Sequence, residues 1–332
     1  MQDHLNRARY FSAAPSYVLA FAGQRDDCSG DVQGIIGIGK KIAERTGREF
    51  VYLDDCTIQK LYPDAEDISF AYSRFSRENG RPDILLSPPR IIVPATLRAP
   101  FQISELNEHF RWKCSTPYKS LVPNNLTAET LNEEERQFRA RHPALHDTII
   151  SVLHISTDGK TDYFAEKLSA MLAADEDLCA TIYLCGTRHT DFDEQNDLYR
   201  SLRSQLVAHR IDNRIQLLNF HLCSVFAERS GYNPYKGLLA TADHFVVLGE
   251  SLSLTSEPLV RGRSVMHMGP VNMKFERLGW VHDFEKLDAA QGLPTRIFEP
   301  VNITDEVADY YVTRLTEIGA PVGTAALQNN FL

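Results

Sequence analysis

Polar side chains of the types that bind nucleotides follow an apolar run in the last third of the chain. Glu250, Ser251 and Ser253 come directly after this run, and Glu257 follows shortly behind them. Backbone N–H groups at the start of a helix attract anions, so a turn leading into a helix suits phosphate groups. The turn therefore offers hydroxyls, free amides and a carboxylate, and this combination predicts a nucleotide site.

The local pattern around these residues indicates short helices alternating with buried strands. Apolar, β-branched runs over 244–248 and 264–268 predict strands, and 234–242 has the pattern of a short amphipathic helix. Proline is tolerated in the first turn of a helix, so Pro258 predicts a helix whose N-cap lies near Ser253 or Thr255. Glu257 is then expected in the first turn of that helix.

Three further loops, at 157–160, 186–190 and 219–221, are expected to meet this turn. Strands predicted near residues 148, 180, 215, 245 and 265 give five β/α repeats, and in such a sheet the loops after successive strands converge on one crevice. Lys160, in the turn 157–160, could neutralise a phosphate. In the turn 186–190, Thr187 precedes Arg188, whose planar, permanently charged guanidinium suits phosphate.

The first half of the chain begins with a second β–loop–α–β pattern. A strand is predicted over 17–22, a helix over 32–45 and a strand over 48–53. The Gly/Asp-rich loop between the first two elements contains Asp26 and Asp27, and Asp31 lies where the helix begins. Asp31 could cap the helix or contact substrate, and the two roles can coexist. Residues 54–79 show no helical or strand period and are expected to be irregular.

The length of 332 residues suits two α/β domains of about 150 residues each. We place them at 1–142 and 143–332, because Pro143 ends an acidic and basic helix over 129–141 that we interpret as the interdomain linker. Thr304, followed by two acidic residues, is expected to cap a final amphipathic helix. The fold class is therefore predicted to be α/β, with two Rossmann-like domains that face a central cleft.

The composition excludes several classes of protein. The net charge is −9 and the pI about 5.7, which argues against a nucleic-acid binder, although a local basic patch and peripheral membrane contact stay open. The apolar runs are strand-sized, so no transmembrane segment or signal peptide is expected. Six scattered cysteines without a C-x-x-C pair indicate reduced thiols in a cytoplasmic protein. No cluster has metal-ligand spacing, so neither a metal nor a resident cofactor is expected.

Several segments together resemble the mitochondrial-fission "elongated mitochondria" family and its bacterial relatives, which are similar in turn to GT-B glycosyltransferases. The segments are NPY from Asn233, LATADHFVV over 239–247, ESLSLTSE over 250–257 and KFERL over 274–278. Further matches are Gly30, Asp31 and Gln33 in the first loop, Arg90, and the turn 187–190. Glu250 and Pro258 replace the aspartate and alanine usual in the family.

The resemblance implies roles for individual residues. The serine-rich turn with Ser251 and Ser253 would receive the donor diphosphate, and Glu257 the ribose. The turn that holds Gly159 stands in the place of the family's glycine-rich loop. The last helix would cross back to the N-terminal domain, as it does in GT-B proteins.

The favoured hypothesis is a metal-independent glycosyltransferase of the GT-B type, which takes a nucleotide-sugar donor and an unidentified glycan or lipid-linked acceptor. Asp31 and Asp27 are the candidates for the general base, with Asp26 beside them. His189, His221 and His267 are further alternatives at strand ends. Two other hypotheses stay open, a non-catalytic nucleotide-binding adaptor of the mitochondrial-fission type and a nucleotide-sugar epimerase.

Overall fold

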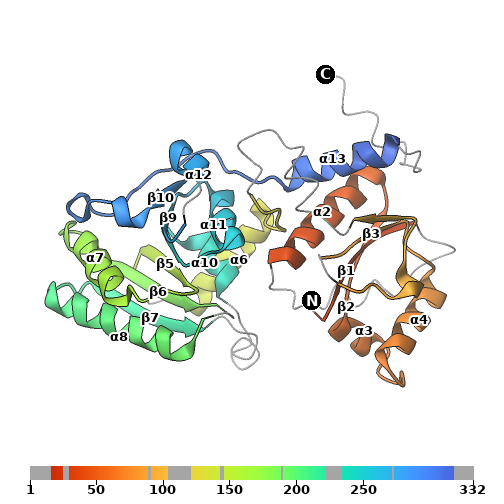
Figure 1. Cartoon of the computed structure of the whole chain (residues 1–332), viewed down its shortest axis with the longest axis horizontal. Helices are drawn as coiled ribbons and strands as arrows, with labels where there is room; N and C mark the ends of the chain where they lie inside the picture. Colours follow the sequence, from red (N-terminus) through yellow and green to blue (C-terminus); the bar gives the residue numbers. More distant parts are fainter. Residues whose placement is uncertain are drawn as a thin grey trace. The chain divides into compact units, whose positions relative to one another are not determined.

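The computed structural model divides into two compact units (Figure 1). It describes residues 16–24, 30–88, 91–103, 121–142, 146–187, 190–221, 234–270 and 273–317. Unit 1 comprises Met1–Asn125 and Asn302–Leu332, and unit 2 comprises Leu126–Val301. The second unit is thus inserted into the first along the sequence.

Unit 2 is built on a six-stranded, fully parallel sheet in the order β10-β9-β8-β5-β6-β7. The strands are β5 (Thr148–His154), β6 (Ala180–Gly186), β7 (Ile215–His221), β8 (His244–Leu248), β9 (Val265–Met268) and β10 (Val281–Asp283). Numbered within the unit, this is the order 6-5-4-1-2-3 of the doubly wound Rossmann fold. The chain therefore starts in the middle of the sheet, builds outward to one edge, and then returns to build the other.

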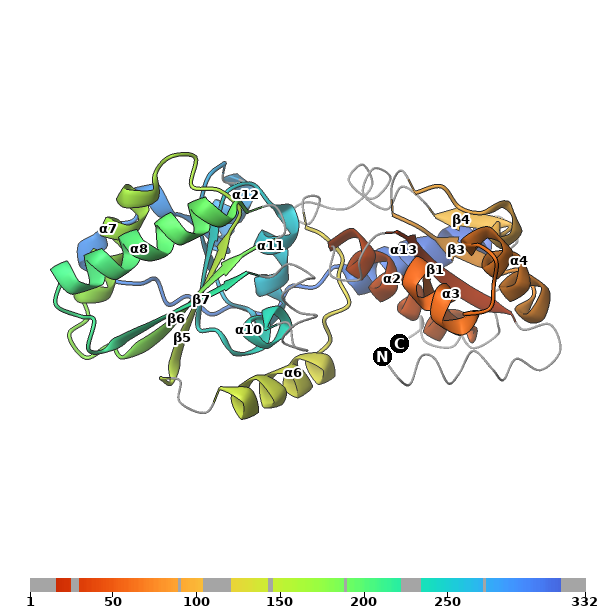
Figure 2. The same cartoon turned by 90° about the horizontal axis from the view of Figure 1, so that it is seen from below.

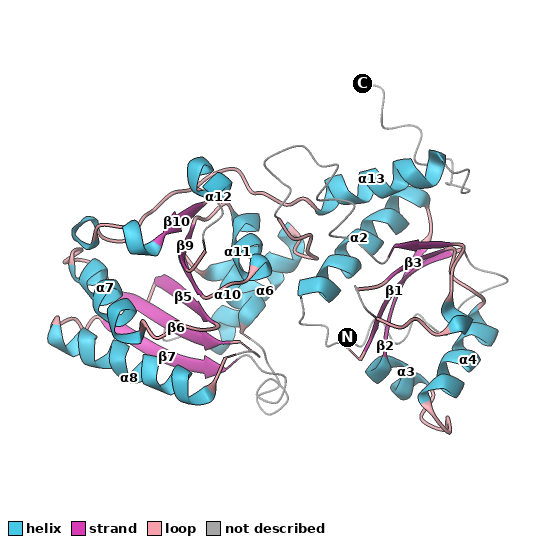
Figure 3. Ribbon diagram, viewed as in Figure 1, coloured by secondary structure: helices cyan, strands magenta, loops and turns pink. Residues whose placement is uncertain are grey.

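Helices cover both faces of this sheet (Figures 2 and 3). They are α6 (Ala128–Arg141), α7 (Thr161–Ala173), α8 (Phe192–Ala208), α10 (Tyr235–Thr241), α11 (Leu252–Ser256) and α12 (Met273–Leu278), with 3₁₀ turns η3 (Glu257–Arg261), η4 (Phe284–Lys286) and η5 (Ala289–Gln291). On one face α7 and α8 bury Phe164, Leu168 and Leu198 against Val152 and Val246. A parallel strand buried on both faces must be apolar throughout, which is why these strands are continuous hydrophobic runs.

Unit 1 holds a four-stranded parallel sheet in the order β2-β1-β3-β4. Its strands are β1 (Tyr17–Gly23), β2 (Glu49–Asp54), β3 (Ile84–Leu86) and β4 (Phe101–Ile103), and its helices are α2 (Gly30–Thr46), α3 (Asp55–Leu61), α4 (Ile68–Asn79) and α13 (Thr304–Glu317), with the 3₁₀ turn η1 (Ala95–Leu97). A core that includes Leu19, Ile58 and Phe75 packs α3 and α4 against one face. On the other side α13 packs along α2.

Asn124 makes two close contacts on the side of unit 1 where α13 packs along α2. The carbonyl of Asn124 would lie 2.2 Å from a Cβ at Gly37, so this helix position admits the passing backbone only because it has no side chain. Thr304, at the start of α13, donates from Oγ1 to the Asn124 carbonyl at 2.8 Å and accepts from the Asn124 amide at 2.9 Å. Both groups are buried, so the last helix is bonded directly to the chain that leaves unit 1.

The structure departs from the sequence expectations in four places. The division falls at Asn125–Leu126 rather than at 142–143, because Leu131 and Phe138 bury the helix expected to be a linker within unit 2, where it packs on α10. Residues expected to be irregular form α3 and α4, which are capped by Asp54 and Asp67. A sixth strand, β10, was not expected. Thr304 bonds to Asn124 instead of acting as a cap, and Asn302 accepts from the Thr304 amide.

Candidate functional site

The strand order of unit 2 creates one topological switch point, between β5 and β8. From β5 the chain proceeds through β6 and β7, and from β8 it proceeds in the opposite direction through β9 and β10. The loops after β5 and β8 therefore leave the sheet toward opposite faces, and the carboxyl ends of these two strands border the crevice where open α/β sheets bind ligands. The residues of this edge form the candidate site.

Gly249, directly after β8, brings the two loops into contact. Its backbone has φ +92°, and an added Cβ would lie 3.1 Å from the Ser156 amide nitrogen and 3.2 Å from its carbonyl oxygen. The carbonyl of Leu248 accepts from the Ile155 amide at 2.9 Å. His267 Nε2 lies 2.9 Å from the Gly249 carbonyl, and burial lowers the pKa of this histidine. A neutral His267 that donates to this carbonyl holds the loop in place.

The helix after Gly249 begins earlier than the sequence predicted. Ser251, not Ser253 or Thr255, is the N-cap of α11, and its Oγ accepts from the Leu254 amide at 3.2 Å. The helix has five residues, and Thr255 donates back to the Ser251 carbonyl at 2.7 Å. The hydroxyls of Ser251 and Ser253 are 3.5 Å apart, so two half-buried hydroxyls stand side by side at the switch point.

Glu257 follows α11 and opens the 3₁₀ turn η3, with Pro258 at its start. Its side chain is only 6% exposed, and Oε2 accepts a hydrogen bond from the buried Tyr235 hydroxyl of α10. Burial raises the pKa of Glu257 to about 7, against the opposing effects of the Tyr235 hydroxyl and the Lys236 charge. The carboxylate therefore lies inside unit 2, with one oxygen already occupied.

The loop after β5 forms a tight turn before α7. Asp158 has φ +51° and Gly159 φ +77°, and no atom lies within 4 Å of where a Cβ on Gly159 would stand. Lys160, the expected phosphate cation, forms an exposed ion pair with Glu285. A hydrogen bond from Lys160 to Glu285 raises the pKa of the lysine. This loop and the thirteen-residue helix α7 place an open, positively polarised helix start beside β5.

A polar network that the sequence did not reveal lies under this loop. Glu194 Oε1 accepts from the Thr157 amide at 2.6 Å and from Thr157 Oγ1 at 2.9 Å. Burial would raise the pKa of Glu194, but the hydrogen bonds from Thr157 and the interaction with His154 together outweigh it, and the pKa is lowered. Fully buried His154, the last residue of β5, bonds through Nδ1 to Gln195 Oε1 at 2.6 Å, and its Nε2 lies 3.5 Å from Glu194.

Gln195 extends this network across the sheet edge by donating to Asn219 Oδ1 at 2.8 Å. The side-chain amide of Gln195 is thus hydrogen-bonded to the ends of β5, β6 and β7. A sequence signal for this network exists in hindsight, because Glu194 and Gln195 open helix α8 behind the cap Asp191. Adjacent positions on a helix point about 100° apart, so the sequence gives no indication that both side chains reach back to β5.

The other predicted residues are distributed as follows. Thr187 joins the site, because its amide donates to the His154 carbonyl at 3.0 Å. Glu250 is exposed at the turn. Asp31 lies in the first turn of α2 in unit 1, inside the helix rather than at its cap. Asp27, Arg188 and Asn233, together with Asp26, Arg90 and His189, fall outside the described residues.

Neither a metal centre nor a membrane span is found in the part of the chain that the structure describes. No three or more His, Cys, Asp or Glu side chains there are grouped so that they could hold a metal ion. No helix among the same residues combines the length and the apolar character needed to cross a bilayer.

Comparison with known proteins gives structural likeness only. No protein-family model matches the chain, and no curated protein matches it either, so the resemblance to the mitochondrial-fission family has no support.

Solved structures align over most of the chain. A provisionally assigned UDP-N-acetylglucosamine 2-epimerase from Listeria monocytogenes has 11% identity over 93% of this chain and 99% of its own, with a TM-score of 0.48. The ADP-heptose lipopolysaccharide heptosyltransferase II of E. coli has 11% identity over 92% and 100%, with a TM-score of 0.46. The UDP-GlcNAc 2-epimerase of Methanocaldococcus jannaschii, in complex with UDP-GlcNAc and UDP, has 10% identity over 91% and 99%, with a TM-score of 0.42. The two parallel sheets of the chain itself, with helices between their strands, show the α/β fold class that the sequence predicted.

Proposed function

We propose that this protein is a glycosyltransferase of the GT-B type and that unit 2 binds its nucleotide-sugar donor at the β5–β8 switch point. One observation carries the proposal, the contact that Gly249 makes with Ser156 where the two loops diverge. Ligands of open parallel sheets bind outside the carboxyl ends of the strands at this position. The side chains gathered there, two serines, Thr187 and Lys160, are donors that suit a diphosphate.

The donor diphosphate is assigned to the groups that can still donate hydrogen bonds. The hydroxyls of Ser251 and Ser253 lie 3.5 Å apart at the start of α11, and the start of α7 contributes backbone amides beside Gly159. Glu194 already occupies the Thr157 amide and hydroxyl with a carboxylate. Because two anions repel each other, the phosphates are expected on the Gly159–Lys160 side of the loop.

The chemistry follows from the charge that develops on the leaving group. The bond between the anomeric carbon and the phosphate oxygen breaks, and the nucleotide diphosphate departs with an additional negative charge. Lys160, the two serine hydroxyls and the α7 start would stabilise that charge without a metal ion. The acceptor hydroxyl forms the new bond, and its proton passes to a carboxylate, for which Asp31 and Asp27 are the candidates.

Titration calorimetry with UDP, ADP, GDP and CDP in the presence of EDTA tests the donor site. We expect one of these diphosphates to bind, and Ser251→Ala to weaken it by about tenfold or more, because a hydrogen bond to a charged group contributes about 1.5–3 kcal/mol. Ser204→Ala, an exposed serine on α8, is the matched control. The proposed donor site is wrong if none of the four diphosphates binds, or if Ser251→Ala binds as the wild type does.

The products then identify the reaction. Incubation of the matching nucleotide-sugar with a panel of glycan and lipid-linked acceptors, followed by chromatography, should release the nucleotide diphosphate and extend one acceptor. Inversion of the configuration at one carbon of the sugar, without release of the nucleotide diphosphate, would instead establish the epimerase. Binding without turnover of any donor would establish a non-catalytic nucleotide-binding protein.

A further inference from the structure

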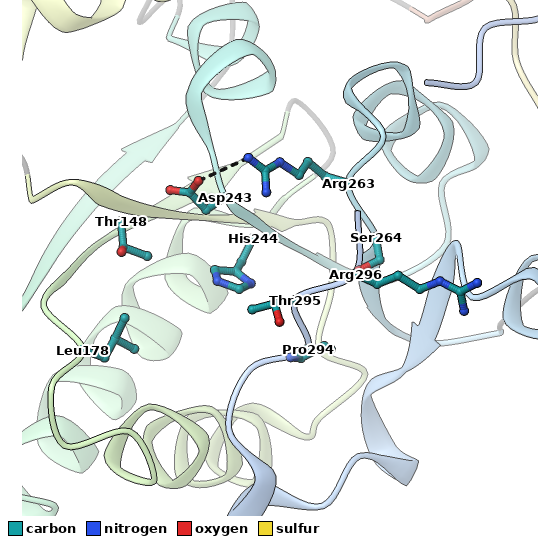
Figure 4. Close-up of a pocket in the computed structure, with 9 residues that line it drawn as sticks. All are labelled: Thr148, Leu178, Asp243, His244, Arg263, Ser264, Pro294, Thr295 and Arg296. Atoms are coloured by element: carbon teal, nitrogen blue, oxygen red, sulfur yellow. Dashed lines mark ion pairs between the residues drawn. The ribbon is translucent and has the colours of Figure 1, made fainter. Parts of the chain in front are cut away.

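A second candidate site lies at the opposite edge of the unit 2 sheet. A cavity of about 310 Å³ opens there at the amino ends of β5 and β8 and in front of β9 (Figure 4). Thr148 begins β5, His244 begins β8 and Ser264 precedes β9, and all three line the cavity. The switch point lies at the carboxyl ends of the same strands, so the cavity is not part of the donor site.

The segment 294–296 passes back over these strand ends and closes the cavity. Residues 294–296 line it, and they run beside the segment that leads into β9. The Ser264 amide donates to the Arg296 carbonyl at 3.4 Å, and Arg263 forms an antiparallel bridge with Ile297. The guanidinium of Arg296 lies against Gly279 and points away from the cavity, so Arg296 contributes backbone rather than charge.

The floor of the cavity is polar but uncharged. His244 is 8% exposed, and burial lowers its pKa, opposed by the Asp243 charge and the Pro294 carbonyl. Arg263, which also lies near, lowers the pKa further. A neutral imidazole can accept or donate one hydrogen bond. Leu178 and Pro294 add apolar surface on the side away from the rim.

The rim carries one charge of each sign. Arg263 Nη2 and Asp243 Oδ1 are 3.6 Å apart, which is longer than a hydrogen bond, and their side chains are 30% and 34% exposed. The second oxygen of Asp243 is held by the Ile149 amide at 3.1 Å. The two charges are therefore fixed side by side, yet the guanidinium fork and one carboxylate oxygen can still bond to a ligand.

We propose that this cavity binds a small apolar α-amino acid. Arg263 would hold the carboxylate through two parallel N–H bonds, and Asp243 would accept from the ammonium group. In an α-amino acid these two groups are separated by a single carbon, which suits a pair of opposite charges at 3.6 Å. The side chain would lie on Leu178 and Pro294. The volume is at the lower end of the range for ligand sites and suits an amino acid rather than a nucleotide-sugar.

Calorimetry on the full chain with alanine, valine, leucine, isoleucine, methionine and phenylalanine, each at millimolar concentration, tests the proposal. At least one is expected to bind one-to-one and to raise the melting temperature. For the best of them, the amine without the carboxylate and the acid without the amino group should each bind about tenfold more weakly or worse, because each loses one charged pair. A saturating nucleotide diphosphate should leave the amino-acid affinity unchanged.

Two variants locate the binding. Arg263→Gln and Asp243→Asn should each reduce the affinity by about tenfold or more, and Asn keeps an oxygen for the Ile149 amide. Arg203→Gln and Asp212→Asn, both at exposed positions of unit 2, are the controls for the loss of charge. The proposal is overturned if no amino acid binds, if the amine and acid analogues bind as well as the parent, or if both cavity variants retain wild-type affinity. The analogues test it on the wild-type protein even where a variant fails to fold.

Discussion

At the scale of single residues, the buried carboxyl of Glu257 makes the stability of unit 2 depend on pH. Its pKa in the folded protein is about 7, above the ordinary 4.5, so the folded state favours the protonated form. This contribution is complete below about pH 4.5 and is lost as the pH rises through 7. Glu257→Gln, which stays uncharged, should lose this decline, so its unfolding free energy should rise relative to that of the wild type across the window. Urea unfolding across the window measures it.

The control for this prediction is Glu176→Gln, an exposed carboxyl of the same unit. It should retain the wild-type dependence of stability on pH. A difference in unfolding free energy between the wild type and Glu257→Gln that stays constant between about pH 4.5 and 7 would contradict the assignment of the raised pKa.

Glu257 also marks the limit of what residue types reveal. A glutamate near a serine-rich turn suggests an open carboxylate, and the resemblance to GT-B proteins implied a ribose contact for it. In the structure the buried Glu257 accepts a hydrogen bond from the hydroxyl of Tyr235, twenty-two positions earlier. Nothing in the sequence near Glu257 predicts this hydrogen bond. The ribose contact stays a prediction, and it would require a ribose hydroxyl to share or replace the Tyr235 bond.

At the scale of elements, the two glycines of the switch-point loops differ in what surrounds them. Gly249→Ala should cost more stability than Gly159→Ala, although both have positive φ. Each substitution carries about 1–2 kcal/mol of backbone strain. Only the Cβ at 249 would press on the Ser156 backbone at 3.1 Å, and at 159 the space is empty. Urea unfolding of the two variants checks the order, and equal losses would show that the loops do not touch as described.

The same pair should also separate in ligand binding. If the contact at Gly249 shapes the donor site, its alanine variant should bind the nucleotide diphosphate more weakly than the Gly159 variant at a temperature where both are folded. Equal affinities would leave the contact a structural one.

The sequence predicts the first five strands of unit 2 and the strands β1 and β2 of unit 1, but not the order of the strands in either sheet. A strand such as β8, with five buried residues in a row, is readable because both of its faces must be apolar. The short strand β10 offers three residues and no period. In α4 the buried Ala71, Phe75 and Asn79 do repeat every four residues, but Asn79 is polar and conceals the pattern. Strand order depends on which helices cross which face, so the place of the switch point had to come from the structure.

At the scale of the whole molecule, one threonine closes unit 1 across 180 positions of sequence. Thr304→Val removes both hydrogen bonds to the buried backbone of Asn124, which costs about 1–3 kcal/mol. Calorimetry should show the transition of unit 1 at a lower temperature and that of unit 2 unchanged. Thr313→Val, at an exposed position of the same helix, is the control. Equal shifts of both transitions would mean that the two units do not unfold separately.

The insertion of unit 2 into unit 1 also sets an order of events on the ribosome. Every residue of unit 2 is synthesised before α13, because α13 follows Val301. The face of α2 that α13 covers therefore stays uncovered until the whole inserted unit has been synthesised. Domains generally fold as units while the chain emerges, so unit 2 is expected to fold first although it comes second. A nascent chain that pauses before residue 302 would present that apolar helix face to chaperones.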